Sequence, residues 1–311
     1  MNMASKSTKK DAPPTVVEET ALVPQAPAGA LAVSDEDEWD FGEDASKGFK
    51  GLSRDEFSIP FYGLLQSNSD IVKKNEVPGA RGGLFINSMT KELCEKLIVQ
   101  PVYVDRVIVE WAPRGSEKKV VGRYKFTDPT VQKAIANNGG SIISSKEKPL
   151  YSGNEKNTLR DTRYLYFNRL AEDGLTIIGF GIMGFSSTKI RMLVDATSAI
   201  GQSGLKCPMW SGRFVLSSFL DRKGPDDFSN VEITAFGRSN LIFDKTNLLP
   251  KPPSNPDAEW NAKHLLYQAG KELEESIVAG KRKADYEGEH VGGGANEGES
   301  VDSPNAGSRH F

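Results

Sequence analysis

Runs rich in β-branched and aromatic residues occur in pairs along the middle of this sequence, and a short turn-like stretch separates the members of each pair. The pairs are residues 97–111 with 120–126, 163–170 with 175–185, and 213–221 with 230–236. This arrangement is typical of β-hairpins, in which consecutive strands run antiparallel. A doubly wound parallel sheet needs strands that alternate with helices, so the spacing disfavours that fold class.

Three segments carry helix signals. Asp128-Pro129 combines an N-cap residue with proline at the first helical position, and Asn138-Gly139 is a stop signal for that helix. A second helix is expected after the capping residues Ser186 and Ser187, and a third over residues 257–279. We therefore predict an α+β fold with an antiparallel, strand-rich core, either OB-like or an elaborated barrel or sheet, with a few helices.

The run 97–111 changes the face on which its apolar residues lie. Val102 and Val104 share one face, whereas Val107, Val109 and Trp111 share the other. An extra residue in a strand produces such a change, so the pattern predicts a β-bulge near residues 105 and 106.

Charge is segregated along the chain. Residues 1–56 contain 6 basic and 12 acidic residues, a net of −6, while residues 57–250 contain 26 basic and 19 acidic residues, a net of +7. Residues 251–311 contain 7 basic and 11 acidic residues, a net of −4. A basic middle attracts polyanions, and acidic ends can shield it or compete for it.

Composition divides the chain into four parts. Residues 1–52 form an acidic tail poor in bulky apolar side chains, and residues 286–311 are rich in Gly, Ser, Asn and Glu, so we expect both tails to be disordered. Residues 53–250 are the predicted basic core, and residues 251–285 contain the C-terminal helix.

Two cysteines, Cys94 and Cys207, are too few for a disulfide framework, and neither has metal-ligand neighbours at the usual spacing. We expect a reduced, intracellular protein with no metal and no cofactor. An apolar stretch long enough for a signal peptide or a membrane span is missing from the sequence, so no membrane association is expected.

Basic and aromatic residues recur side by side within the core. Cations follow phosphates and flat rings stack on unpaired bases, so this combination is typical of single-strand binding. Aromatic residues in strands are more often core residues, and a single Lys or Arg is more often solvated surface, but three such clusters in a basic core favour the binding hypothesis. The candidate nucleic-acid-binding residues are Arg123, Tyr124, Lys125, Phe126, Arg163, Tyr164, Tyr166, Arg169, Lys189, Arg191, Trp210, Arg213 and Phe214.

Alternation along 163–169 places Tyr164 and Tyr166 on one face of the expected strand and Leu165 and Phe167 on the other. We predict that the two tyrosines face the ligand.

Two other patterns could indicate an enzyme, and each also has a simpler structural interpretation. Gly179-Phe-Gly-Ile-Met-Gly184 has dinucleotide-fingerprint spacing, but the run before it is the second arm of a hairpin rather than the start of a βαβ unit. Glycines that let a neighbour approach a strand are the simpler interpretation. A metal-dependent nuclease would need carboxylates to gather, and the candidates are Asp195, Asp221, Asp226 and Asp227, three of which surround an ordinary turn sequence.

Aromatic residues also occur within the two acidic tails. Trp39 and Phe41 lie in the cluster from Asp35 to Asp44, and Phe311 ends the sequence. These three residues are candidates for binding a protein partner or the basic groove, and a purely solubilising tail is the alternative.

The stretches Phe57–Ser69 and Pro78–Asn87, together with the strand ending Val109-Glu-Trp111, resemble bacteriophage single-stranded DNA-binding proteins. The resemblance is to the binding cofactors of phages that encode their own RNA polymerase, and it covers about the first third of the core. Gly307–Phe311 keeps a terminal aromatic but not a run of acids, which departs from tails that recruit partners.

The resemblance implies a non-enzymatic protein that coats single-stranded DNA in replication, recombination or transcription, in the cytoplasm of an infected bacterium. Its partners would be single-stranded DNA, a phage RNA polymerase or replication proteins, and further copies of itself on DNA. A phage structural or assembly protein that forms homo-oligomers without DNA is the main alternative, and the metal-dependent nuclease is the second.

Overall fold

The computed structural model describes residues 58–113, 120–137, 157–223, 226–255 and 258–282, together with Ala284 and Tyr286. Both predicted tails lie outside the described residues, apart from Tyr286, as do Trp39, Phe41 and Phe311.

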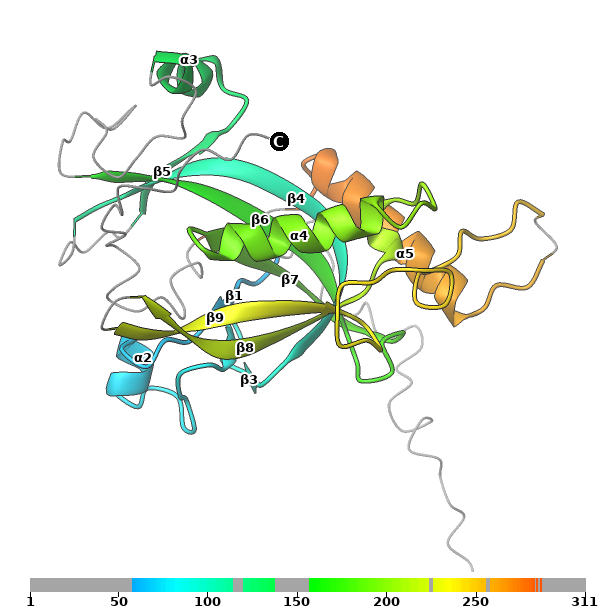
Figure 1. Cartoon of the computed structure of the whole chain (residues 1–311), viewed down its shortest axis with the longest axis horizontal. Helices are drawn as coiled ribbons and strands as arrows, with labels where there is room; N and C mark the ends of the chain where they lie inside the picture. Colours follow the sequence, from blue (N-terminus) through cyan, green and yellow to red (C-terminus); the bar gives the residue numbers. More distant parts are fainter. Residues whose placement is uncertain are drawn as a thin grey trace, which may run out of the picture. The chain divides into compact units, whose positions relative to one another are not determined.

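The larger sheet is antiparallel and has six strands, which follow the order β7-β6-β4-β8-β9, with β5 also paired to β4 (Figure 1). The strands are β4 (Leu97–Trp111), β5 (Val120–Lys125), β6 (Thr158–Leu170), β7 (Ile177–Ser186), β8 (Phe214–Lys223) and β9 (Asp226–Ala235). All three predicted hairpins are present, which confirms the antiparallel α+β prediction. The described strands form an open sheet and not a closed barrel.

β4 is the central strand of this sheet, because two different strands, β8 and β5, pair with the same edge of it. β6 pairs with almost the whole length of β4. On the opposite edge, β8 pairs only with Leu97–Val99, and β5 pairs with Val107–Trp111. The β8–β9 hairpin and the β5 end of the sheet therefore diverge from opposite ends of one strand (Figure 1).

The β-bulge in β4 lies earlier than predicted. The register between β4 and β6 shifts between Pro101 and Tyr103, not at residues 105 and 106. Proline cannot donate a ladder hydrogen bond, so Pro101 is a natural place for the pairing to be interrupted. Val102 is nevertheless buried beside the interruption.

Helices α3 (Pro129–Asn137), α4 (Lys189–Gly201) and α5 (Ala262–Val278) correspond to the three predicted helices. Asp128 caps α3, since its carboxylate accepts a hydrogen bond from the Thr130 N–H at 2.8 Å. The prediction that Ser186 and Ser187 cap α4 was wrong: the N-cap is Thr188, without a side-chain bond. Ser186 is the last residue of β7, and Ser187 adopts a positive φ of 53° in the turn that follows.

A second sheet has three very short strands, β1 (Tyr62–Leu64), β2 (Phe85–Asn87) and β3 (Leu93–Cys94), in the order β1-β2-β3. The short helix α2 (Asp70–Lys73) lies between β1 and β2 in the chain. The chain just before β1 joins this sheet to the larger one, because Phe61 and Ile182 form a parallel bridge and the Ile182 N–H donates to the Pro60 carbonyl at 2.9 Å.

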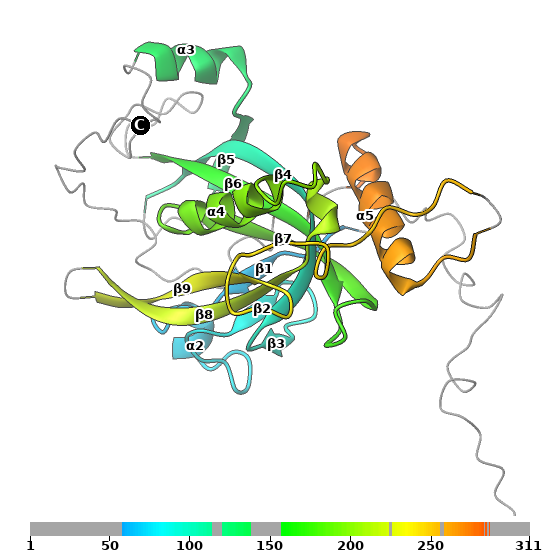
Figure 2. The same ribbon diagram turned by 45° about the vertical axis from the view of Figure 1, so that its right-hand side comes forward.

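Both faces of the β6–β7 region are buried. On one face, Leu165, Phe167 and Met183 pack with residues of α4 and β8 in the largest apolar cluster. On the other face, Tyr164 and Tyr166 pack with Phe61, Val107 and Ile182 in a second cluster. Figure 2 shows α4 beside the β6–β7 region and near the β8–β9 hairpin.

Helix α5 packs against β4 through a buried amide. Gln100 donates from Nε2 to the carbonyls of Trp210 and Leu266, at 2.8 and 2.9 Å, and its Oε1 accepts from Asn168 Nδ2 at 2.7 Å. The short 3-10 helix η3 (Met209–Ser211) is held by the same side chain. Within the described part of the chain, no helix combines the length and apolar character needed to cross a membrane.

Candidate nucleic-acid interface

The third predicted cluster lies mostly in the packed interior. Phe214 is fully buried, and Arg213 is only 5% exposed. The Arg213 guanidinium donates to the carbonyls of Gly174 and Asn247, at 3.1 and 3.2 Å, and lies over the Phe236 ring. Trp210 packs edge-on against Tyr267. Arg213 and Phe214 therefore belong to the packed interior beside η3, whereas Trp210 is half-buried.

The second cluster is also largely committed to packing. Tyr164 is 0% exposed and Tyr166 is 6% exposed, so neither ring is open for base stacking in this structure. Burial raises the pKa of the Tyr166 hydroxyl far above its ordinary value. Arg169 forms a bidentate ion pair with Glu92, with distances of 2.5 and 2.6 Å.

The chain's own C-terminal segment contacts the face on which these tyrosines lie. The Tyr286 ring is 5.8 Å from the ring of Tyr164 and 5.7 Å from that of Phe61. Arg123 donates to the Tyr286 carbonyl at 3.2 Å and stacks on its ring, while its Nε donates to the Tyr164 hydroxyl at 3.3 Å. Arg123 is therefore engaged with this aromatic group.

The remaining members of the first cluster occupy different environments. The Tyr124 hydroxyl donates to buried Glu110 at 2.7 Å, and Lys125 is exposed. Phe126 is half-buried, and the guanidinium carbon of Arg106 lies 3.6 Å from the centre of its ring. Arg106 was not among the predicted residues, although its cross-strand neighbour Arg163 was.

Arg106 and Arg163 are directly opposite each other on β4 and β6. Both oxygens of Asp161 bind Arg106, at 3.0 Å each. Arg163 is half-buried, and its Nε is buried with no hydrogen-bond partner among the described residues. Like charges opposite each other in a sheet are unfavourable, and so is a buried donor without a partner. A bound anion such as a phosphate would relieve both costs.

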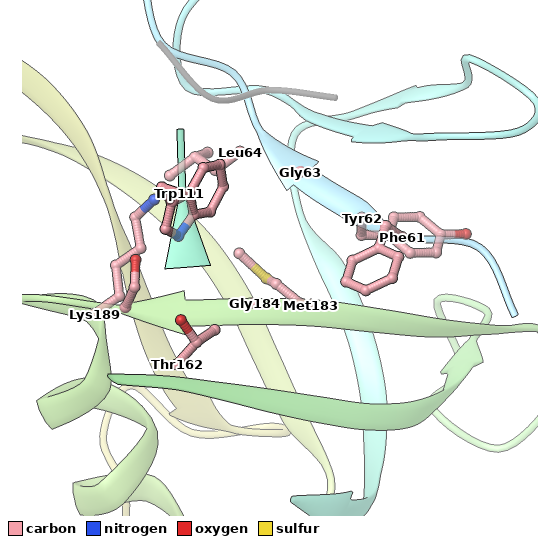
Figure 3. Close-up of a pocket in the computed structure, with 10 residues that line it drawn as sticks. Phe61, Tyr62, Gly63, Leu64, Trp111, Thr162, Met183, Gly184 and Lys189 are labelled. Atoms are coloured by element: carbon pink, nitrogen blue, oxygen red, sulfur yellow. The ribbon is translucent and has the colours of Figure 1, made fainter. Parts of the chain in front are cut away.

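A pocket lies at the same end of β6, and Figure 3 shows the side chains that line it. Trp111, Thr162, Met183 and Lys189 contribute its walls, together with Phe61 and Tyr62. In Figure 3, Trp111 and Lys189 lie at one end of the pocket, while Phe61 and Tyr62 lie at the other. Of these residues, only Lys189 was predicted. The prediction relied on basic and aromatic residues that are neighbours in the sequence, whereas the residues that line the pocket come from segments far apart in the sequence.

The structure describes the side chains of the last predicted cation and of three predicted carboxylates, whereas the side chain of Asp226 lies outside the described ones. Arg191 is exposed on α4 and pairs with Asp195 at 3.6 Å. Asp221 accepts a hydrogen bond from Asn230, and Asp227 accepts one from Arg222. In the part of the chain that the structure describes, no three His, Cys, Asp or Glu side chains gather as metal ligands would.

The glycine-rich run Gly179–Gly184 lies within β7, the second arm of its hairpin, as the simpler interpretation required. A Cβ on Gly181 would lie 2.5 Å from the Phe167 ring and 2.6 Å from the Tyr62 ring. This glycine therefore allows two aromatic rings to pack against the strand.

The fold and this surface define an antiparallel α+β protein with a cationic and aromatic site at one end of its main sheet. The chain matches the family model described as Pam3 phage gp34-like protein over residues 30–283, and it belongs to that family of bacteriophage proteins. No curated protein and no solved structure matches the chain.

Proposed function

We propose that this protein binds single-stranded DNA through a surface centred on Arg163. The observation that carries the proposal is the Arg106–Arg163 pair: the two arginines are direct cross-strand neighbours, the Asp161 carboxylate binds Arg106, and the buried Nε of Arg163 has no partner among the described residues. Arginine in this state is suited to the planar, bidentate recognition of a phosphate.

Three further features support a polyanion with unpaired bases as the ligand. Phe126 places an aromatic ring beside Arg106, and Trp111 supplies a second, half-buried ring at the same end of the sheet. The predicted core carries a net charge of +7. Rings that stack on bases and cations that follow phosphates are the two requirements of sequence-tolerant single-strand binding.

For a phage protein, such binding would serve replication, recombination or transcription in the cytoplasm of the infected cell, with a phage RNA polymerase or replication proteins as partners. Binding along a strand would be cooperative and sensitive to salt.

The first test compares Arg163→Gln with the wild-type protein in fluorescence anisotropy, using labelled oligo-dT and a duplex of equal length over a range of salt. We expect the wild type to prefer the single strand, and Arg163→Gln to bind about 10- to 150-fold more weakly, since a hydrogen bond to a charged group contributes about 1.5–3 kcal/mol. The slope of log K against log salt should become shallower by about 0.7 for one lost phosphate contact.

Arg238→Gln is the matched control, because Arg238 is a partly exposed arginine already bound to Asp244 and Thr246. It removes the same charge and should bind like the wild type. Arg163→Gln should also raise the stability of the free protein by about 0.2–1 kcal/mol, because it removes like-charge repulsion across the strands. Equal affinities for Arg163→Gln and Arg238→Gln, or equal binding of single strand and duplex, would contradict the proposal.

The β8–β9 hairpin favours a second candidate, self-association in phage assembly. β8 pairs with β4 only through Phe214–Leu216, so among the described strands none pairs with the outer part of β8 on that side. Leu220 is 75% exposed in this outer part. An open strand edge with an exposed apolar residue can pair with another chain. Light scattering and electron microscopy of the purified protein without DNA should then show large oligomers, and Leu220→Lys should disperse them.

A further inference from the structure

The wall of the pocket contains a buried hydroxyl group whose bonding is incomplete. Thr162 is only 3% exposed, and its Oγ1 has no hydrogen-bond partner among the described residues. A buried polar group in this state costs about 1–3 kcal/mol. Because Thr162 lines the pocket, a ligand in the pocket is the natural partner for its hydroxyl (Figure 3).

The other walls suit a flat ring attached to a negative charge. The Trp111 indole is a broad aromatic surface, and Met183 adds a polarizable thioether, a group that packs well against rings. Lys189 lies at the Trp111 end of the pocket, where its ammonium group can reach a phosphate (Figure 3). A hydrogen-bonding group, a flat apolar wall and a cation are together the contacts that a nucleotide requires.

The size of the pocket limits which base it can hold. Its volume is about 60 Å³. At about 10–15 Å³ for each water molecule, this is room for roughly five waters, which is comparable to one six-membered ring. A purine carries a second fused ring and would have to leave part of itself outside.

The position of the pocket connects it to the phosphate site. Thr162 and Arg163 are neighbours in β6, and side chains alternate between the faces of a strand. Thr162 and Arg163 therefore point to opposite faces at the same end of the sheet, and the pocket that Thr162 lines adjoins the Arg163 site. A flexible single strand can pass around this end and contact both.

We propose that the pocket receives a pyrimidine base of the bound single strand, with Thr162 as its hydrogen-bonding partner, Trp111 as its stacking surface and Lys189 as a contact to the adjacent phosphate. This proposal rests on the proposed single-strand binding, and it adds a preference among bases to a surface otherwise tolerant of sequence.

The experiment measures the affinity of the full chain for oligo-dT, oligo-dC and oligo-dA of equal length. We expect the wild type to bind the two pyrimidine oligonucleotides about 5- to 10-fold more tightly than oligo-dA, consistent with discrimination of about 1–1.4 kcal/mol. Thr162→Val keeps the shape of the side chain and removes the hydroxyl, so it should fold normally and reduce this preference to less than 2-fold.

Thr197→Val is the matched control, because the Thr197 hydroxyl donates to carbonyls of its own helix, at 2.9 and 3.1 Å, and does not line the pocket. This variant should keep the preference for pyrimidines. As a second readout, oligo-dT should quench the tryptophan fluorescence of the wild type, and Trp111→Phe should lose most of that quenching.

The possible outcomes separate the two proposals. Binding that depends on Arg163 but shows no preference among bases, or a preference that Thr162→Val leaves unchanged, would overturn the pyrimidine pocket and leave single-strand binding intact. Failure of the wild type to bind any of the oligonucleotides would overturn both.

Discussion

Tyr164 illustrates how one side chain can match a binding pattern and still be part of the core. It is 0% exposed, its ring packs edge-on against Phe61 with a centroid distance of 5.6 Å, and its hydroxyl accepts a hydrogen bond from Arg123. We expect Tyr164→Ala to lower the free energy of unfolding by about 3–5 kcal/mol, the usual cost of deleting a buried aromatic ring. Tyr164→Phe should cost only about 0.5–1.5 kcal/mol. Urea denaturation measures both, and similar losses for the two variants would contradict this role.

The Glu92–Arg169 pair should make stability depend on pH. The hydrogen bonds from Arg169 hold the pKa of the Glu92 carboxyl below its ordinary value of 4.5. A lowered pKa in the folded state stabilises the fold above pH 4.5, and this contribution disappears as the pH falls through the folded-state pKa. Because the Glu92 side chain is 46% exposed, solvent screening limits the effect to less than about 1 kcal/mol.

Glu92→Gln tests that dependence. The variant should be less stable than the wild type at pH 7, and the difference in unfolding free energy should shrink when denaturation is repeated at successively lower pH below 4.5. A difference that stayed constant across this range would show that the ionised carboxylate is not the cause.

The sequence showed which side chains share a face of a strand, but it did not show which of those side chains are buried. The alternation along β6 correctly separated Tyr164 and Tyr166 from Leu165 and Phe167, because strand geometry fixes it locally. Which face meets a ligand depends on what covers each face, and here both are covered by segments distant in the sequence. Arg106 and Thr162 gain their importance only from cross-strand and pocket neighbours, which no local pattern contains.

At the scale of elements, Gly270 in α5 provides a test in which helix propensity and packing oppose each other. Alanine normally replaces a helical glycine with a gain of about 0.5–1 kcal/mol. A Cβ on Gly270, however, would lie 2.6 Å from Gln100 Nε2 and 2.8 Å from the Trp210 Cβ. We expect Gly270→Ala to destabilise the protein by about 1–3 kcal/mol, because it forces apart the contact between α5 and β4.

Gly201, the last residue of α4, is the matched control. Nothing lies within 4 Å of the position that its Cβ would take, so Gly201→Ala should be neutral or stabilise by up to about 1 kcal/mol. Thermal denaturation of both variants compares the signs, and a stabilising Gly270→Ala would show that the buried amide of Gln100 does not hold α5 closely.

Long elements could be predicted and short ones could not. β4, the hairpins and the three longer helices have strong periodic patterns and clear turn signals, so their ends were predicted to within a few residues in most cases. β1, β2 and β3 have only two or three residues each, too few for a period to be recognised. The bulge predicted near residues 105 and 106 was wrong because the apolar residues change face there without an extra residue: Val104 packs in the cluster on one face, and Val107 and Val109 pack in the cluster on the other.

At the scale of the whole molecule, the segregation of charge should affect binding. The acidic residues Asp35, Glu36, Asp37 and Glu38 belong to a segment with a net charge of −6, and we expect them to compete electrostatically with a bound nucleic acid for the basic core. Replacing these four with Asn and Gln should tighten the binding of oligo-dT several-fold at low salt. The gain should fade near 1 M salt, where the Debye length falls to about 3 Å.

Anisotropy titrations of this variant and of the wild type at several salt concentrations measure the effect. Four Ser→Asn substitutions in the same tail, at Ser5, Ser7, Ser34 and Ser46, leave the charge unchanged and should leave affinity unchanged. A gain that persisted at high salt would indicate a contact other than charge competition.

β4 also has a mechanical consequence. Its one continuous backbone carries Arg106 near the proposed binding end and Val99 at the point where the β8–β9 hairpin crosses, and these positions are roughly 23 Å apart at a strand rise of about 3.3 Å per residue. Because a hydrogen-bonded strand resists stretching, β4 keeps the distance between Val99 and Arg106 nearly constant. For copies that associate through their hairpins while holding one nucleic acid, the length of this strand would set the interval between successive contacts.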